Sequence, residues 1–119
     1  NLLICLSMEK ITKEQMFRSV SDLSSGIAQG MKEIANGNAS SVDIVKNLAD
    51  ALHNELTHLS DEYGKNDKGV EKIVNAFKGV AYMADNVDNK DVYYCREVHT
   101  AIAETILLLR EKVFMEYYD

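Results

Sequence analysis

The chain has 119 residues, of which 46% are hydrophobic and 27% are charged, a composition that indicates one folded domain and argues against global disorder. Its 13 basic and 19 acidic side chains give a formal net charge of −6, and no run of Lys or Arg could follow a phosphate backbone, so we expect no nucleic-acid partner. Proline is absent, which favours long helices, and no apolar run is long enough to cross a bilayer, so we expect no membrane partner.

The first strong helical pattern covers residues 13–36. Its apolar residues recur at spacings of three and four, which places them on one face of a helix: Met16, Val20, Leu23, Ile27, Met31 and Ile34. Thr12 and Gln15 have capping-box spacing, and Gly37 is a natural stop. The sequence therefore predicts a helix over 13–36, preceded by an apolar leader over 1–11.

Three further amphipathic segments follow, over residues 41–63, 68–85 and 91–117. Ser40 is the predicted N-cap of the second segment and Gly64 its stop, while Asp67 and Asp91 are the predicted N-caps of the third and fourth. The connections are short and leave no room for crossovers. We therefore predict a single all-α domain, an antiparallel up-down-up-down four-helix bundle with short loops.

The last segment carries more apolar side chains than one buried face can use. Its predicted core stripe consists of Cys95, Val98, Ile102, Ile106, Leu109 and Val113. A second line, with most members seven residues apart, lies roughly opposite this stripe: Tyr93, Thr100, Leu107 and Phe114, with Tyr118 beside it. Charged residues border the line, namely Arg96, Glu104, Arg110 and Glu111.

Aromatic residues concentrate where partners bind, so this second line predicts a partner-binding surface formed by Tyr93, Thr100, Leu107, Phe114 and Tyr118. The partner is either a second copy of the chain or another protein. An alternative stays open within the chain itself. The apolar leader needs cover and could dock on the region from Leu107 to Phe114.

Cys5 and Cys95 are predicted at opposite ends of the bundle, too far apart for a disulfide. We expect free thiols, with Cys95 buried, and a cytoplasmic location. Cys95 and His99 are four apart on one helix and form a weak zinc alternative, with His53 within one or two turns. No fourth ligand is apparent, so we predict no metal site and no cofactor.

Gly26 and Gly30 lie inside the first predicted helix, where each costs about 1 kcal/mol relative to alanine. Gly79 interrupts the third predicted helix at a similar height. Three explanations fit: a close approach of these two helices, a cavity for a small ligand, or a docked partner helix.

The sequence contains no glycine-framed nucleophile and no phosphate-binding loop, so we do not expect an enzyme. The predicted function is a non-catalytic protein–protein interaction module, of the adaptor, neutralising or immunity, or chaperone-like kind. The alternative is a helical bundle that binds a small ligand or a metal ion.

Overall fold

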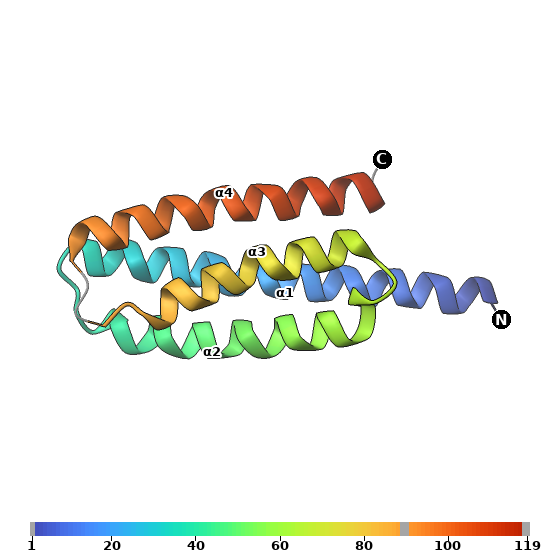
Figure 1. The fold of residues 1–119 in the computed structure, drawn as a ribbon, viewed down its shortest axis with the longest axis horizontal. Helices are drawn as coiled ribbons and strands as arrows, with labels where there is room; N and C mark the ends of the chain where they lie inside the picture. The colour runs from blue at the N-terminus through green and yellow to red at the C-terminus, as the bar shows by residue number, and fades with distance from the viewer. Residues whose placement is uncertain (1, 89–90, 118–119) are drawn as a thin grey trace.

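The computed structural model describes the backbone of residues 2–88 and 91–117, and the side chains of residues 12–88 and 91–111. It contains four helices, α1 (Leu2–Ala35), α2 (Ser41–Leu59), α3 (Lys68–Asp85) and α4 (Val92–Tyr117). A π-helical turn, η1 (Ser60–Gly64), continues α2, and no strand occurs in this described part. Consecutive helices run in opposite directions (Figure 1). The predicted all-α four-helix bundle is confirmed.

The helices form a ring in chain order. α1 packs chiefly against α2 and α4, and α3 packs against the same two helices while hardly touching α1. Short connections impose this arrangement, because each helix must return beside the one before it. Among the described residues, no helix is long and apolar enough to cross a membrane.

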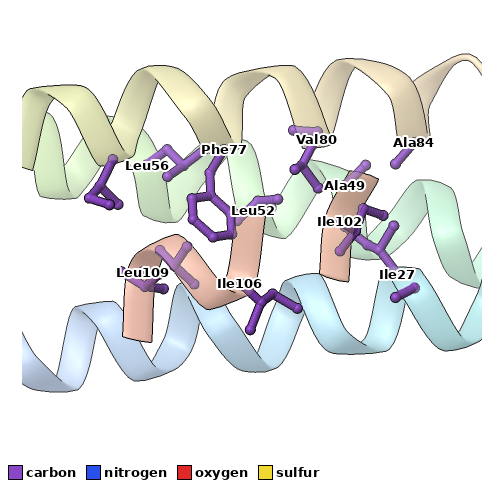
Figure 2. Close-up of a cluster of buried hydrophobic side chains, with 14 of the residues drawn as sticks. Ile27, Ala49, Leu52, Leu56, Phe77, Val80, Ala84, Ile102, Ile106 and Leu109 are labelled. Atoms are coloured by element: carbon purple, nitrogen blue, oxygen red, sulfur yellow. The ribbon is translucent and has the colours of Figure 1, made fainter. Parts of the chain in front are cut away.

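The core lies between the four helices and is almost purely apolar. Side chains from every helix point toward one another along the bundle (Figure 2). Its largest fully buried members include Phe17, Ile27, Leu52, Phe77 and Ile102. Each buried side chain of this size contributes roughly 1.5–3 kcal/mol by leaving water, which is the main term that stabilises the fold.

α1 begins at Leu2, so the predicted start at residue 13 is wrong. Neither Gly nor Pro occurs in residues 2–12, and the segment read as a separate leader therefore continues the helix. The ribbon of α1 extends beyond the connection between α2 and α3 (Figure 1). Lys13 marks where the bundle begins, since its Nζ lies 3.3 Å from Asp67 Oδ2 and 5.1 Å from the centre of the Tyr63 ring.

Gly37 ends α1, as predicted. Its φ of +100° is a left-handed conformation that glycine adopts without strain. The N–H of Gly37 donates to Ile34 O at 3.0 Å, and the N–H of Asn38 donates to Glu33 O at 2.9 Å. These two bonds form a Schellman motif, which satisfies carbonyls that the helix end leaves without an intrahelical partner.

The predicted caps of the second and third helices have different outcomes. Asp67 is the N-cap of α3, because its Oδ1 accepts hydrogen bonds from two backbone N–H groups of the first turn, at 2.9 and 3.2 Å. Ser40 is not a side-chain cap of α2, since its backbone is helical and its hydroxyl makes no capping bond. Instead Ser41 ties α2 to α1, with its buried Oγ donating to Glu33 Oε2 at 2.8 Å.

Candidate functional site

α4 is fixed by its two neighbours and by its first turn. Asp91 caps it as predicted, because its Oδ1 accepts a hydrogen bond from the N–H of Tyr94 at 2.8 Å. The Tyr94 hydroxyl donates to Met83 O of α3 at 2.7 Å. On the other side of α4, His99 Nδ1 lies 3.0 Å from Ala28 O of α1. One side of α4 therefore faces α3 and the other faces α1.

The side of α4 that faces the core is buried. Its buried residues follow the predicted stripe and include Cys95, Val98, Ile102, Ile106 and Leu109. Burial is the main reason that the pKa of the Cys95 thiol is raised, and the nearby Asp91 carboxylate adds to the effect. Cys95 is a free thiol, as predicted, whereas the side chain of Cys5 lies outside the described residues.

We name the line Tyr93, Thr100 and Leu107 the outer seam of α4. Residues seven apart fall on nearly the same side of a helix, and this side is turned away from the core. The Tyr93 side chain is 71% exposed and Leu107 is 58% exposed, and Thr100 is exposed between them. The alternative in which residues 1–11 cover Leu107 does not hold, because Leu107 keeps this exposure in the folded chain. Phe114 and Tyr118 were predicted to continue this surface, and their side chains lie outside the described residues.

Two further lines with the same spacing flank the outer seam. The basic edge consists of Arg96, Ala103 and Arg110, and the acidic edge consists of Glu97, Glu104 and Glu111. All six residues are exposed. A step of 100° per residue puts the basic edge on the side of His99, toward α1, and the acidic edge on the side of Tyr94, toward α3.

The charges of the two edges have no ion-pair partner within the described part of the chain. The spacing explains why none forms inside α4. A helix brings together residues three or four apart, whereas each Arg of the basic edge is one, six, eight or more positions from each Glu of the acidic edge. These charges are therefore available to an external surface.

Exposed large apolar residues elsewhere in the described chain are scattered. Ile44 lies alone on α2 with 56% exposure, and Tyr82 lies alone on α3 with 68% exposure. Single exposed apolar side chains are ordinary on soluble proteins. α4 differs because several exposed apolar residues lie on this one helix, namely Val92, Tyr93, Leu107 and Leu108.

A pocket of about 350 Å³ lies between the end of α1 and the start of α4. Its lining residues are Lys32, Ala35, Asn36, Arg96, His99 and Thr100. None of them carries a carboxylate, so the pocket is basic although the chain as a whole is acidic. Because a carbonyl oxygen only accepts, the 3.0 Å contact with Ala28 O requires the proton of a neutral His99 ring on Nδ1, which leaves Nε2 for other partners.

The structure does not place further metal ligands beside Cys95 and His99, the pair considered as a zinc site. His99 is occupied at Nδ1 by Ala28 O, and Cys95 is buried among core residues. His53, which was considered as a third ligand, has its Nε2 2.8 Å from Asp85 Oδ2 instead. Within the described residues, no group of three or more His, Cys, Asp or Glu side chains is placed to hold a metal ion.

The predicted glycine level between the first and third helices does not exist. Gly26 and Gly30 face α2, because a Cβ added to Gly26 would lie 3.0 Å from Leu48 Cδ1 and one added to Gly30 would clash with Val45 Cγ2. Gly79 is exposed, and a Cβ there meets nothing within 4 Å. Gly26 and Gly30 allow a close contact between α1 and α2. Gly79 takes no part in this contact, although it lies at a similar height in the sequence-based alignment of the helices.

Comparison with known proteins finds no match, since no protein-family model, no curated protein and no solved structure is significantly similar to this chain.

Proposed function

We propose that this chain is a non-catalytic protein–protein interaction module that binds its partner through the outer face of α4. The observation that supports this function is the 58% exposure of Leu107, in line with the 71% exposure of Tyr93, on a helix whose other side is already buried. An apolar line of this kind remains in contact with water until a second surface covers it.

The energetics of the outer seam suit a partner with its own apolar surface. Covering the exposed 58% of Leu107 is worth roughly 1–2 kcal/mol, and an aromatic side chain such as Tyr93 is of the type that dominates binding energy at interfaces. Association itself costs several kcal/mol in lost freedom, so one residue is not sufficient. The same spacing continues in the sequence to Phe114, which adds a further anchor to the proposed interface.

The free thiol of Cys95 suits a reducing compartment, and we propose that the module acts in the cytoplasm. There the binding step needs no cofactor. Apolar contact along the seam supplies affinity, and the charges on its two edges set the alignment of the partner.

Replacing Leu107 with Glu tests this function. The wild-type protein, the Leu107→Glu variant and an Ile44→Glu control would each be used to recover partners from an extract of the source organism. Ile44 is a suitable control because it is equally exposed but lies on α2. We expect the wild type and Ile44→Glu to retain the same partner and Leu107→Glu to lose it. Equal recovery by all three proteins contradicts the proposal.

A second candidate function, binding of a small organic anion, is favoured by the pocket between α1 and α4. Lys32 and Arg96 line it without a carboxylate, and its volume is within the range of small-ligand sites, roughly 300–1,000 Å³. Calorimetric titration with glycerol 3-phosphate, and with glycerol as the uncharged control, tests this candidate. Lys32→Gln should weaken binding at least about tenfold, whereas Lys78→Gln on the exposed side of α3 should not. Absence of saturable binding to the wild type rejects the candidate.

A further inference from the structure

We infer that the partner of the outer seam is a second copy of this chain, and that the two α4 helices lie side by side in parallel, related by a two-fold axis along the bundle. The inference rests on the proposed function, because it names the occupant of the same surface. Its evidence is the separation of charge on α4, with Arg96 and Arg110 on one side of the seam and three Glu residues on the other.

The exposed part of α4 has the pattern of a helix that pairs with another helix. Three lines run side by side with a spacing of seven residues: the outer seam in the middle, the basic edge toward α1 and the acidic edge toward α3. Flanking charges beside an apolar line are the feature that sets partner and orientation in paired helices. All nine residues of the three lines are exposed, so each is accessible to a second helix.

Symmetry decides which orientation these charges favour. A two-fold axis parallel to the helices turns the basic edge of one copy toward the acidic edge of the other, at the same height, on both sides of the seam. Arg96 then lies level with Glu97 of the second copy, and Arg110 lies level with its Glu111. Four side chains from each copy find opposite charges without any change in the fold.

An antiparallel pair would place like charges next to each other. Its two-fold axis is perpendicular to the helices and keeps each edge on its own side, so arginines lie beside arginines and glutamates beside glutamates. Like charges placed together at an interface oppose association. The parallel pair is therefore the arrangement that this surface selects.

The parallel arrangement also brings each residue of the outer seam against its own counterpart. Leu107 meets Leu107, which buries the largest aliphatic residue of the seam. Thr100 meets Thr100, and its hydroxyl already donates to Arg96 O at 3.2 Å, so covering this residue leaves its donor satisfied.

Charge exchange tests the pairing. One variant carries Arg96→Glu with Arg110→Glu, and the other carries Glu97→Arg with Glu111→Arg. Sedimentation velocity over a range of concentrations should show a wild-type dimer, and each variant alone should dissociate with a constant at least about tenfold higher. An equimolar mixture of the two variants should restore the dimer. The matched control, Lys72→Glu with Lys78→Glu on the exposed side of α3, should remain dimeric, and circular dichroism should show that every variant is folded.

Single cysteines test the orientation, in a Cys5→Ser background in which the remaining native thiol, Cys95, is buried. In a parallel pair, Thr100→Cys should form a disulfide with itself, and so should Leu107→Cys. In an antiparallel pair centred on the seam, Thr100 again lies beside Thr100, but Leu107 lies beside Tyr93 of the second copy, so Leu107→Cys should cross-link only in a mixture with Tyr93→Cys. Asn75→Cys, exposed on α3, is the control and should stay reduced between copies.

The possible results bear differently on the second copy, its orientation and the proposed function. Cross-linking of Leu107→Cys only in the mixture with Tyr93→Cys overturns the parallel arrangement, and a wild type that is monomeric at all concentrations overturns the second copy as the partner. A monomer that still captures another protein in a Leu107-dependent way leaves the proposed function standing. A monomer that captures nothing overturns both.

Discussion

The face of α1 toward α2 and the outer face of α4 both depart from an ordinary amphipathic helix, in opposite ways. α1 lacks side chains at Gly26 and Gly30, and α2 fills the space, with Leu48 and Val45 in close contact with the glycines. α4 has a surplus of apolar side chains, and Leu107 remains 58% exposed. The space left by the two glycines is filled within the chain, so it matters for folding. The exposed apolar side chains of α4 are not covered within the chain, and for this reason we propose that the outer face of α4 serves association.

The largest effect should come from filling the close contact of α1 with α2. Gly30→Leu should lower the free energy of unfolding by about 3 kcal/mol, because even a Cβ at this position clashes with Val45. Urea denaturation measures the loss. Gly79→Leu is the control, since its Cβ has open space, and it should gain up to about 1 kcal/mol from helix propensity. Equal losses at both positions would contradict the close contact.

The hydrogen bond between α2 and α1 should be the next most sensitive feature. Ser41→Ala should cost about 2 kcal/mol, because it removes a buried donor that lies 2.8 Å from the Glu33 carboxylate. Thermal denaturation with Ser40→Ala as the control measures this. Ser40 is exposed and makes no capping bond, so its replacement should cost less than about 0.5 kcal/mol. A small effect at Ser41 would show that the side chain does not hold the two helices together.

Much of the fold could be predicted from the sequence, because spacing and caps are local signals. The bounds 68–85 of the third helix agree with α3, and Asp67 caps it as expected. The start of α1 was missed because Thr12 and Gln15 have capping-box spacing, although no Gly or Pro before them breaks the helix. Thr12 lies inside α1, so its spacing to Gln15 does not mark the start of the helix.

The outer seam could also be predicted, whereas the neighbours of each residue could not. Spacing alone separated Leu107 from the buried stripe of α4. Height along the bundle was not sufficient to find the neighbour of Gly30, because α1 has two adjacent helices and the facing side decides which one it meets. Glu97 was overlooked, although its distance of seven residues from Glu104 was a usable signal.

The buried side of α4 should make stability depend on pH through Cys95. Burial raises the pKa of this thiol, so above its ordinary value of 9.0 the unfolded chain loses a proton that the native protein keeps. Stability therefore falls as the pH rises, and between pH 8 and 10 the fall should be larger for the wild type than for Cys95→Ala, by up to about 1 kcal/mol. Urea denaturation at several pH values measures the two slopes. Equal slopes would contradict a buried, protonated thiol.

A smaller effect, of opposite sign, is expected where α1 buries a polar atom without a partner. Ser24 Oγ is fully buried and has no hydrogen-bond partner within the described residues. Ser24→Ala should therefore raise the free energy of unfolding by about 1 kcal/mol, since it removes an unsatisfied hydroxyl and improves helix propensity. Ser25→Ala, exposed on the same helix, should gain only the propensity term. A loss on replacing Ser24 would indicate a hidden hydrogen bond.

The smallest effect should be at the outer seam itself. At concentrations low enough to keep the protein monomeric, Leu107→Glu should change the free energy of unfolding by less than about 0.5 kcal/mol. Leu109→Ala, two residues further on but buried, should cost about 3 kcal/mol by urea denaturation. A large cost at Leu107 would mean that the chain covers this side chain and needs it to fold. A small cost, together with loss of binding, separates the side of α4 that builds the bundle from the side that meets a partner.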